Sequence, residues 1–297
     1  MSKQGITEHE LSIPAGTDHP QLAATLRLPA AEPGSPPQRR PAIIVLHGFG
    51  STRQAPNVTV PATLYAQWGY VALSFDMPGC GQSGGTPGHV LCLDQVAATR
   101  AAIDWLSQRE DVDASRIAVS GTSFGAAVAL YTTGVDARIK AVVAAGGWGN
   151  GARKLRGQHP GPGAWEKFLA LLEQGKAMKA RGETLKVHRF DIVPIPPHLR
   201  IGLPENALME FPIDTAQSIY DFRPDDVIAA IAPRPALFLH ASVDSVTPTS
   251  ESIAMFQIAR PPAELHLFTG VDHFMLGERN ARVQDTLAGW LRMHFPA

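Results

Sequence analysis

The residues of this chain that are best suited to carry out a reaction are a serine and the two glycines that flank it. Gly121, Ser123 and Gly125 belong to a G-x-S-x-G pentapeptide, which follows the apolar run 116–120 and precedes the small-residue run 126–130. This order predicts a strand, a sharp turn and a helix. Such a turn strains the serine backbone and leaves no room for side chains two residues away on either side. The pattern predicts a nucleophile elbow with Ser123 as the nucleophile.

A serine hydroxyl near neutral pH needs a base to take its proton and a third group to orient that base. His273 lies in the segment 270–274, just after the last apolar strand-like run, and is the predicted base. Asp244 lies in the segment 242–248, after the preceding run, and is the predicted orienting acid. Asp272 competes for that role, but the side chain next to a histidine usually points elsewhere. The resulting order of serine, aspartate and histidine fits a parallel α/β sheet.

The segment 46–50, with sequence LHGFG, is predicted to form the oxyanion hole. Its glycines let the backbone approach a substrate, so the N–H of Phe49 can point at a developing oxyanion. The N–H of Phe124, at the start of the elbow helix, is the second predicted donor. His47 is interpreted as a structural residue whose ring braces this loop.

The other histidines have weaker claims to a catalytic role. His240 and His266 lie inside apolar runs, where a satisfied or half-exposed core histidine is the ordinary situation. His159, His188 and His198 fall in the segment 148–220, where surface exposure is the expected environment, although a contact with substrate stays open.

Apolar patterning indicates an α/β fold. Residues 6–13 and 22–28 alternate apolar and polar side chains, as a hairpin at a sheet edge does. Continuous apolar runs predict buried strands at 41–46, 69–75, 116–120, 139–145, 235–241 and 264–268. Helices are expected around 93–107, 165–181, 249–258 and 281–294, and a surface loop over 30–40. Strands that alternate with helices imply a mainly parallel sheet covered on both faces.

The segment 148–220 interrupts this alternation. It contains a predicted helix and a proline-rich stretch at 193–197, but no buried strand pattern. We interpret it as a lid inserted into a core domain formed by 1–147 and 221–297; extra helices packed on the sheet edge are the alternative. Trp148, Phe190 and Phe211 are the candidates for contacts with substrate, and the insertion could also supply a homodimer surface.

Composition excludes several classes of protein. Among 297 residues, 44% are hydrophobic and 18% are charged, which suits a globular core. The formal net charge of −1 gives no reason to expect nucleic acid or an anionic membrane as a partner. Cys80 and Cys92 are too few for a disulfide framework and predict no zinc site. The sequence shows no signal-peptide core and no membrane span, so a cytoplasmic protein is expected.

Five motifs together resemble the α/β-hydrolase superfamily: HGFG at 47–50, DMPGCGQS at 76–83, GTSFG at 121–125, SVDSVTP at 242–248 and VDHF at 271–274. The chain is most similar to its serine aminopeptidase-like and dienelactone-hydrolase-like esterases. The resemblance implies a central sheet of about eight strands, with catalytic residues on loops at the carboxyl ends of strands. The insertion at 148–220 matches no pattern of the family.

The expected activity is cleavage of a carboxylic ester of a small molecule through an acyl-enzyme on Ser123, with no metal or organic cofactor. Two alternatives use the same residues: a peptidase or amidase, and a hydrolase of carbon–carbon bonds. A third is a non-catalytic small-molecule receptor on the same scaffold, which could retain the catalytic residues. Family resemblance alone does not separate them, because one fold hosts many activities.

Overall fold

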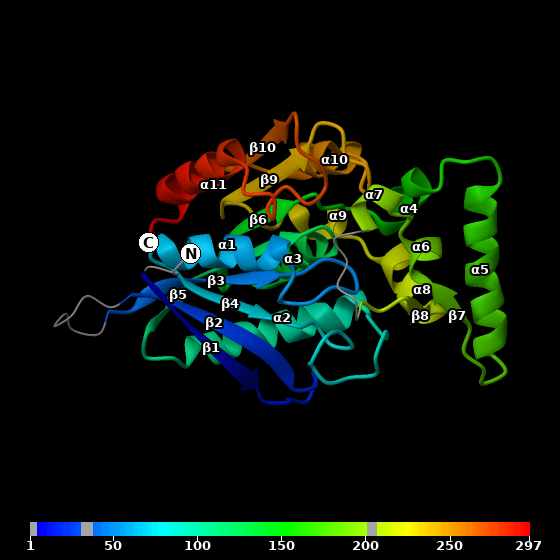
Figure 1. The fold of residues 1–297 in the computed structure, drawn as a ribbon, viewed down its shortest axis with the longest axis horizontal. Helices are drawn as coiled ribbons and strands as arrows, with labels where there is room; N and C mark the ends of the chain where they lie inside the picture. The colour runs from blue at the N-terminus through cyan, green and yellow to red at the C-terminus, as the bar shows by residue number, and fades with distance from the viewer. Residues whose placement is uncertain (1–4, 31–37, 201–206) are drawn as a thin grey trace.

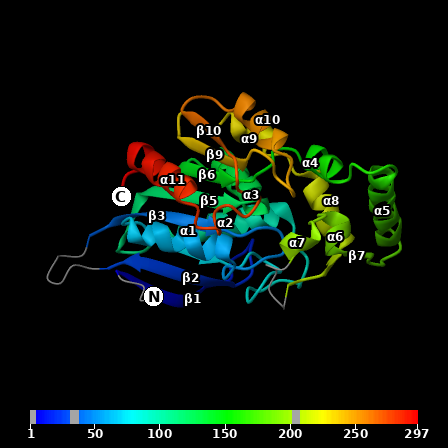
Figure 2. The same cartoon turned by 45° about the horizontal axis from the view of Figure 1, so that its top comes forward.

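The architecture is an eight-stranded sheet with helices on both faces (Figures 1 and 2). The computed structural model describes residues 5–30, 38–200 and 207–297. The strands of the main sheet lie in the order β1-β2-β4-β3-β5-β6-β9-β10. Their bounds are β1 Ile6–Ile13, β2 Leu22–Pro29, β3 Arg40–Leu46, β4 Val71–Phe75, β5 Val112–Thr122, β6 Ile139–Ala145, β9 Ala236–Ala241 and β10 Ala263–Phe268. A separate two-stranded sheet pairs β7 (Lys186–His188) with β8 (Glu210–Pro212).

The predicted mostly parallel α/β sheet is confirmed. β1 pairs antiparallel with β2, and β2 pairs antiparallel with β4, so the predicted hairpin sits at one sheet edge. From β4 to β10 every neighbouring pair is parallel. The loop predicted over 30–40 falls mostly on 31–37, which lies outside the described residues.

The described helices cover both faces of the sheet. They are α1 Pro56–Gln67, α2 Cys92–Ser107, α3 Phe124–Val135, α4 Gly151–Gln158, α5 Ala164–Lys179, α6 Arg189–Ile192, α7 Pro197–Arg200, α8 Ile213–Asp221, α9 Asp225–Ile228, α10 Ser250–Ile258 and α11 Ala281–His294. Along β3, Ile43 and Val45 join the core under α1 and α11, whereas Ala42, Ile44 and Leu46 join the core under α2 and α3. This alternation follows from the two-residue period of a strand. Within the described helices, none is long and apolar enough to cross a membrane.

Most of the segment between β6 and β9 forms a unit at one end of the molecule. Helices α4 to α8 with β7 and β8 gather there in both views (Figures 1 and 2). Two side chains of α8 dock this unit on the start of α2, since Val90 N–H donates to Thr215 and Cys92 N–H donates to Ser218. Apolar side chains of the unit belong to the same hydrophobic cluster as the sheet. The insertion is therefore packed onto the core rather than hinged away from it.

Candidate active site

Ser123 occupies a strained turn between β5 and α3, as the pentapeptide predicts. Its φ of 57° and ψ of −117° lie outside the backbone regions that residues other than glycine favour. Holding a residue in such a conformation costs about 1–3 kcal/mol. The surrounding backbone holds it there: Ser123 N–H donates to the carbonyl of Ala145 at 2.8 Å, and Ala126 N–H donates to the Ser123 carbonyl at 3.0 Å. The side chain lines a cavity at the carboxyl end of the strand.

The two glycines of the pentapeptide are required by close backbone packing. A Cβ added to Gly121 would lie 2.2 Å from the carbonyl oxygen of Gly125. A Cβ added to Gly125 would lie 2.6 Å from the carbonyl oxygen of Leu46. Both contacts are with backbone, which cannot move aside as a flexible side chain could. The elbow therefore brings β5, α3 and the end of β3 into direct contact.

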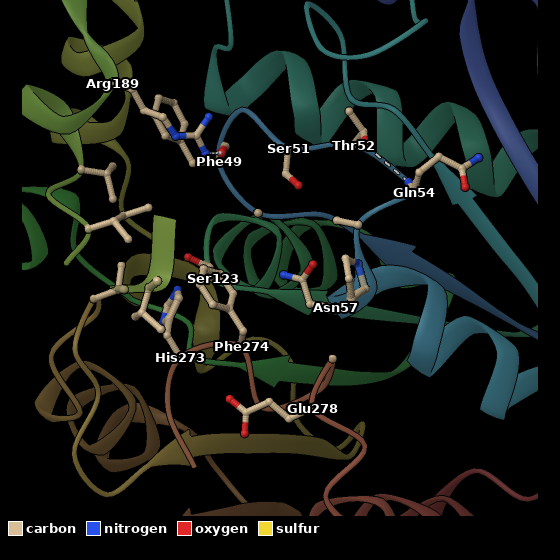
Figure 3. Close-up of a pocket in the computed structure, with 18 residues that line it drawn as sticks. Phe49, Ser51, Thr52, Gln54, Asn57, Ser123, Arg189, His273, Phe274 and Glu278 are labelled. Atoms are coloured by element: carbon tan, nitrogen blue, oxygen red, sulfur yellow. Dashed lines mark hydrogen bonds between the residues drawn. The ribbon is translucent and has the colours of Figure 1, made fainter. Parts of the chain in front are cut away.

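His273 and Asp244 are hydrogen-bonded although they are far apart in the sequence. Asp244 follows β9 and His273 follows β10, and the Nδ1 of His273 lies 2.8 Å from Oδ2 of Asp244. Because Nδ1 faces a carboxylate, it carries the ring proton in the neutral imidazole. The Nε2 atom is then the basic nitrogen, and the ring lines the same cavity as Ser123 (Figure 3).

The Asp244 carboxylate accepts more hydrogen bonds than the sequence suggests. Its Oδ1 accepts from the N–H groups of Val246 and Thr247 at 2.8 and 2.7 Å. A second imidazole, His240, places Nε2 at 3.1 Å from Oδ2. Burial by itself raises the pKa of Asp244, but the charges and hydrogen bonds of His273 and His240 outweigh it and hold that pKa well below its usual range. Asp244 therefore stays ionised beside the imidazole.

The competing acid, Asp272, has another set of partners. Its carboxylate accepts from the N–H and hydroxyl of Ser245 at 2.8 and 2.6 Å, and from the backbone N–H of His273 at 2.7 Å. Burial alone would raise the pKa of Asp272, but these hydrogen bonds outweigh burial and lower it. These hydrogen bonds of Asp272 join the loop that carries Asp244 to the loop that carries His273. The His273 ring is hydrogen-bonded to Asp244 instead.

His47 braces the predicted oxyanion loop. Its ring is fully buried: Nδ1 lies 2.8 Å from the Gly48 carbonyl, and Nε2 accepts the N–H of Met77 at 2.9 Å. These partners fix the neutral tautomer with the proton on Nδ1, and burial lowers the pKa of His47. Because a peptide group is planar and trans, holding the Gly48 carbonyl also fixes the opposite direction of the Phe49 N–H.

The second predicted donor, the N–H of Phe124, lies at the first position of α3. A helix offers no internal acceptor to its first N–H groups, so this amide is available to an anion. The rings of Phe49 and Phe124 lie 6.0 Å apart. The structure thus brings Ser123, Phe49, Phe124, His273 and Asp244 to one place.

The cavity has a volume of about 370 Å³ and a mostly apolar lining. Val193, Ile195 and Leu199, all from the insertion, contribute apolar side chains. Polar side chains also line the cavity (Figure 3). These polar residues are Ser51, Thr52, Gln54, Asn57, Arg189 and Glu278. Among the described residues, no group of three or more His, Cys, Asp or Glu side chains could hold a metal ion.

The three aromatic candidates for substrate contact lie beside the cavity, and none of them is among its described lining residues. Trp148 is buried, with its ring 6.5 Å from that of Phe124. Phe211 is buried, with the centre of its ring 4.5 Å from the centre of the Phe49 ring. Phe190 is half-buried under the guanidinium of Arg200, at 3.8 Å. Their contact with a ligand stays a prediction.

For two residues, the sequence did not predict a place in the site. Arg189 is one arginine among many, and nothing local marks it as buried. His240 was expected to be a satisfied core histidine, and it is buried and hydrogen-bonded. The one available signal was its position: a polar residue in an apolar strand, four residues before the acid.

Comparison with known proteins defines the class. The chain matches the alpha/beta hydrolase family over residues 43–286 and belongs to that family. The crystal structure of the hypothetical protein PA2218 from Pseudomonas aeruginosa is similar, with a TM-score of 0.83 and 24% identity, over 98% of this chain and 95% of that one. This family membership places the protein among the alpha/beta hydrolases.

Two relatives with descriptive names are also similar. The polyketide transferase GrgF of Penicillium sp. is 25% identical over 80% of this chain and 82% of its own length. The acetyl xylan esterase from Paenibacillus sp. R4 has a TM-score of 0.67 and 20% identity, over 99% of this chain and 86% of that one. The likeness to the esterase shows the fold alone.

Proposed function

We propose that the protein is a serine hydrolase that cleaves a carboxylic ester of a small molecule through an acyl-enzyme on Ser123. The observation that carries this proposal is the convergence of four loops on one cavity. They bring the strained Ser123, the hydrogen-bonded pair of His273 and Asp244, and the braced Gly48–Phe49 peptide. The name of the acetyl xylan esterase that shares the fold supports an ester as the substrate.

Each residue has a defined role in the reaction. The Ser123 oxygen attacks the ester carbonyl while Nε2 of His273 takes the hydroxyl proton. The N–H groups of Phe49 and Phe124 donate to the oxyanion, and the proton on His273 passes to the leaving alcohol. Water then attacks the acyl-enzyme, again with His273 as the base. Asp244 holds the tautomer of His273 and stabilises its cation without taking the proton.

The apolar and polar residues that line the cavity suit the two parts of an ester. An apolar acyl group would pack against Val193, Ile195 and Leu199, where burial stabilises it by roughly 25 cal/mol for each Å² of apolar surface. A polar leaving group would face Asn57 and Glu278. A volume of about 370 Å³ favours a small molecule over a polymer chain enclosed along its length.

The test compares Ser123→Ala with Ser51→Ala, since both serines line the cavity. Ser123→Ala should lower kcat on a p-nitrophenyl ester by at least about 10⁴-fold, because the acyl-enzyme can no longer form. Ser51→Ala should keep most of the activity. A fluorophosphonate probe should label the wild type and Ser51→Ala only. Full activity in Ser123→Ala would contradict the proposal.

The same assay separates the alternatives. An amidase would turn over an aminoacyl anilide at least as well as the matched short acyl ester. A carbon–carbon hydrolase would prefer a diketone. A receptor with a disabled serine would fail to react with the fluorophosphonate and would turn over none of the three substrates.

A further inference from the structure

Arg189, the first residue of α6 in the insertion, carries a charge that is buried without a carboxylate partner. Only 3% of the residue is exposed. Burial lowers the pKa of its guanidinium to about 10, so it remains charged at neutral pH. Among the described residues, no carboxylate forms an ion pair with it, and its Nε atom has no hydrogen-bond partner. Such a buried charge is costly unless other polar groups hold it.

Backbone carbonyls take the place of the missing carboxylate. Nη1 donates to the carbonyls of Gly50 at 3.0 Å and Leu208 at 3.1 Å, and Nη2 donates to the carbonyl of Phe49. The guanidinium also lies 5.5 Å from the centre of the Phe49 ring (Figure 3). Two of its three acceptors thus belong to the loop that carries the Phe49 N–H, the predicted oxyanion donor.

The insertion also confines that loop sterically. The ring of Phe211, from β8, packs 4.5 Å from the ring of Phe49. Gly50 adopts a left-handed φ of 53°, and a Cβ added there would lie 2.6 Å from Cζ of Phe211 and 2.9 Å from Nη1 of Arg189. The loop and the insertion therefore fit against each other with no spare volume.

The direction of the Phe49 N–H depends on the peptide groups on both sides of Phe49. His47 and the N–H of Ser51 hold the Gly48 carbonyl, and so orient the peptide that contains this N–H. Arg189 holds the carbonyls of the next two peptides. With both neighbours fixed, the dihedral angles of Phe49 are fixed as well, because peptide groups are rigid planes.

We propose that Arg189 is a positioning residue for the oxyanion loop, so that the insertion completes the catalytic machinery instead of only covering it. This inference rests on the proposed function. It makes the donor geometry at Phe49 depend on a residue 140 positions away in the chain.

The test measures kcat and KM for Arg189→Met and Arg189→Lys with a p-nitrophenyl ester. Arg223→Met is the matched control, because Arg223 also donates to backbone carbonyls, those of Tyr220 and Phe222. Arg189→Met should lower kcat about 10- to 100-fold with KM within threefold, less than the 10²–10³-fold of losing an oxyanion donor outright. Arg189→Lys should recover part of the loss. Arg223→Met should match the wild type.

A transition-state readout separates positioning from general damage. Affinity for a trifluoromethyl ketone, which forms a tetrahedral adduct with the serine, should fall in Arg189→Met by the same factor as kcat. Unchanged kcat, or a raised KM with kcat intact, overturns the inference. So does a failure of both Arg189 variants to fold, because Arg189 would then be purely structural. Full activity in Ser123→Ala would instead overturn the proposed function.

Discussion

Lys154, on α4 of the insertion, predicts an unusual dependence of stability on pH. The residue is 3% exposed, and its Nζ lies 5.6 Å from the centre of the Trp148 ring. Burial lowers the pKa of Lys154 from 10.5 to about 7, although the nearby charge of Glu251 opposes this. Glu251 does not neutralise Lys154 directly, because its carboxylate is bound by the guanidinium of Arg153.

The sign of the effect follows from proton binding. Between pH 7 and 10.5 the unfolded chain keeps a proton on Lys154 that the folded chain has lost, so the free energy of unfolding rises with pH. The slope approaches about 1.4 kcal/mol for each pH unit well above the folded pKa. From pH 7.0 to 8.5 the gain amounts to about 2 kcal/mol. Above that window the thiols interfere, because burial raises the pKa of Cys80 and Cys92 to about 12.

Urea titrations at pH 7.0 and 8.5 measure this gain. Replacing Lys154 with Met removes the titrating group and keeps most of the side-chain volume, so Lys154→Met should show about 2 kcal/mol less gain than the wild type. Lys140→Met is the control, since Lys140 is exposed on β6 and should leave the wild-type gain unchanged. Equal gains in Lys154→Met and the wild type would refute the reasoning.

Two further comparisons probe the elbow and the acid. Asp244→Asn should lower kcat by about 10⁴-fold through loss of the His273 tautomer, whereas Asp272→Asn should stay within about tenfold; equal losses in ester turnover would leave the acid unassigned. Gly125→Ala should lower the free energy of unfolding by more than about 2 kcal/mol because its Cβ meets backbone. Gly289→Ala, inside α11, should stabilise the protein by about 1 kcal/mol in the same urea titration, because the added Cβ would lie 3.8 Å from Nη2 of Arg292 without a clash. A neutral Gly125→Ala would argue against the packing at the elbow.

The sheet could be predicted because its signals are local. Parallel strands buried on both faces read as continuous apolar runs, and β3, β4, β6 and β9 show this pattern. The elbow was predictable for a similar reason, since strand, turn and helix are consecutive in the sequence. The predicted acid and base follow successive core strands, which places both at the same edge of a parallel sheet.

Other parts of the molecule depend on contacts that no short window of sequence contains. The helix α1 was not predicted: it has Pro61 in its interior, where a proline removes one hydrogen bond, and its buried side chains follow no clear amphipathic pattern. The short pairing of β7 with β8 was also missed, because three-residue strands carry too little periodicity to detect. Arg189 acquires its environment only when the insertion docks on the loop after β3.

The aromatic residues of the insertion illustrate a different limit. Apolar rings pack in a core and bind apolar ligands through the same forces, so residue type does not distinguish the two roles. Trp148 and Phe211 are fully packed against other rings, whereas the aliphatic Val193 and Ile195 face the cavity. Only the three-dimensional arrangement decides which apolar residues are free to meet a ligand.

The uneven exposure of the cavity wall has a consequence for the size of ligands. Among the described lining residues, Gln54, Pro56 and Glu278 are exposed, while Val193 and Ile195 are buried. We therefore expect a molecule to enter past the exposed rim and to stop against the buried side. Homologous compounds lengthened at the inner end should meet a sharp cut-off, whereas those lengthened at the outer end extend freely into solvent.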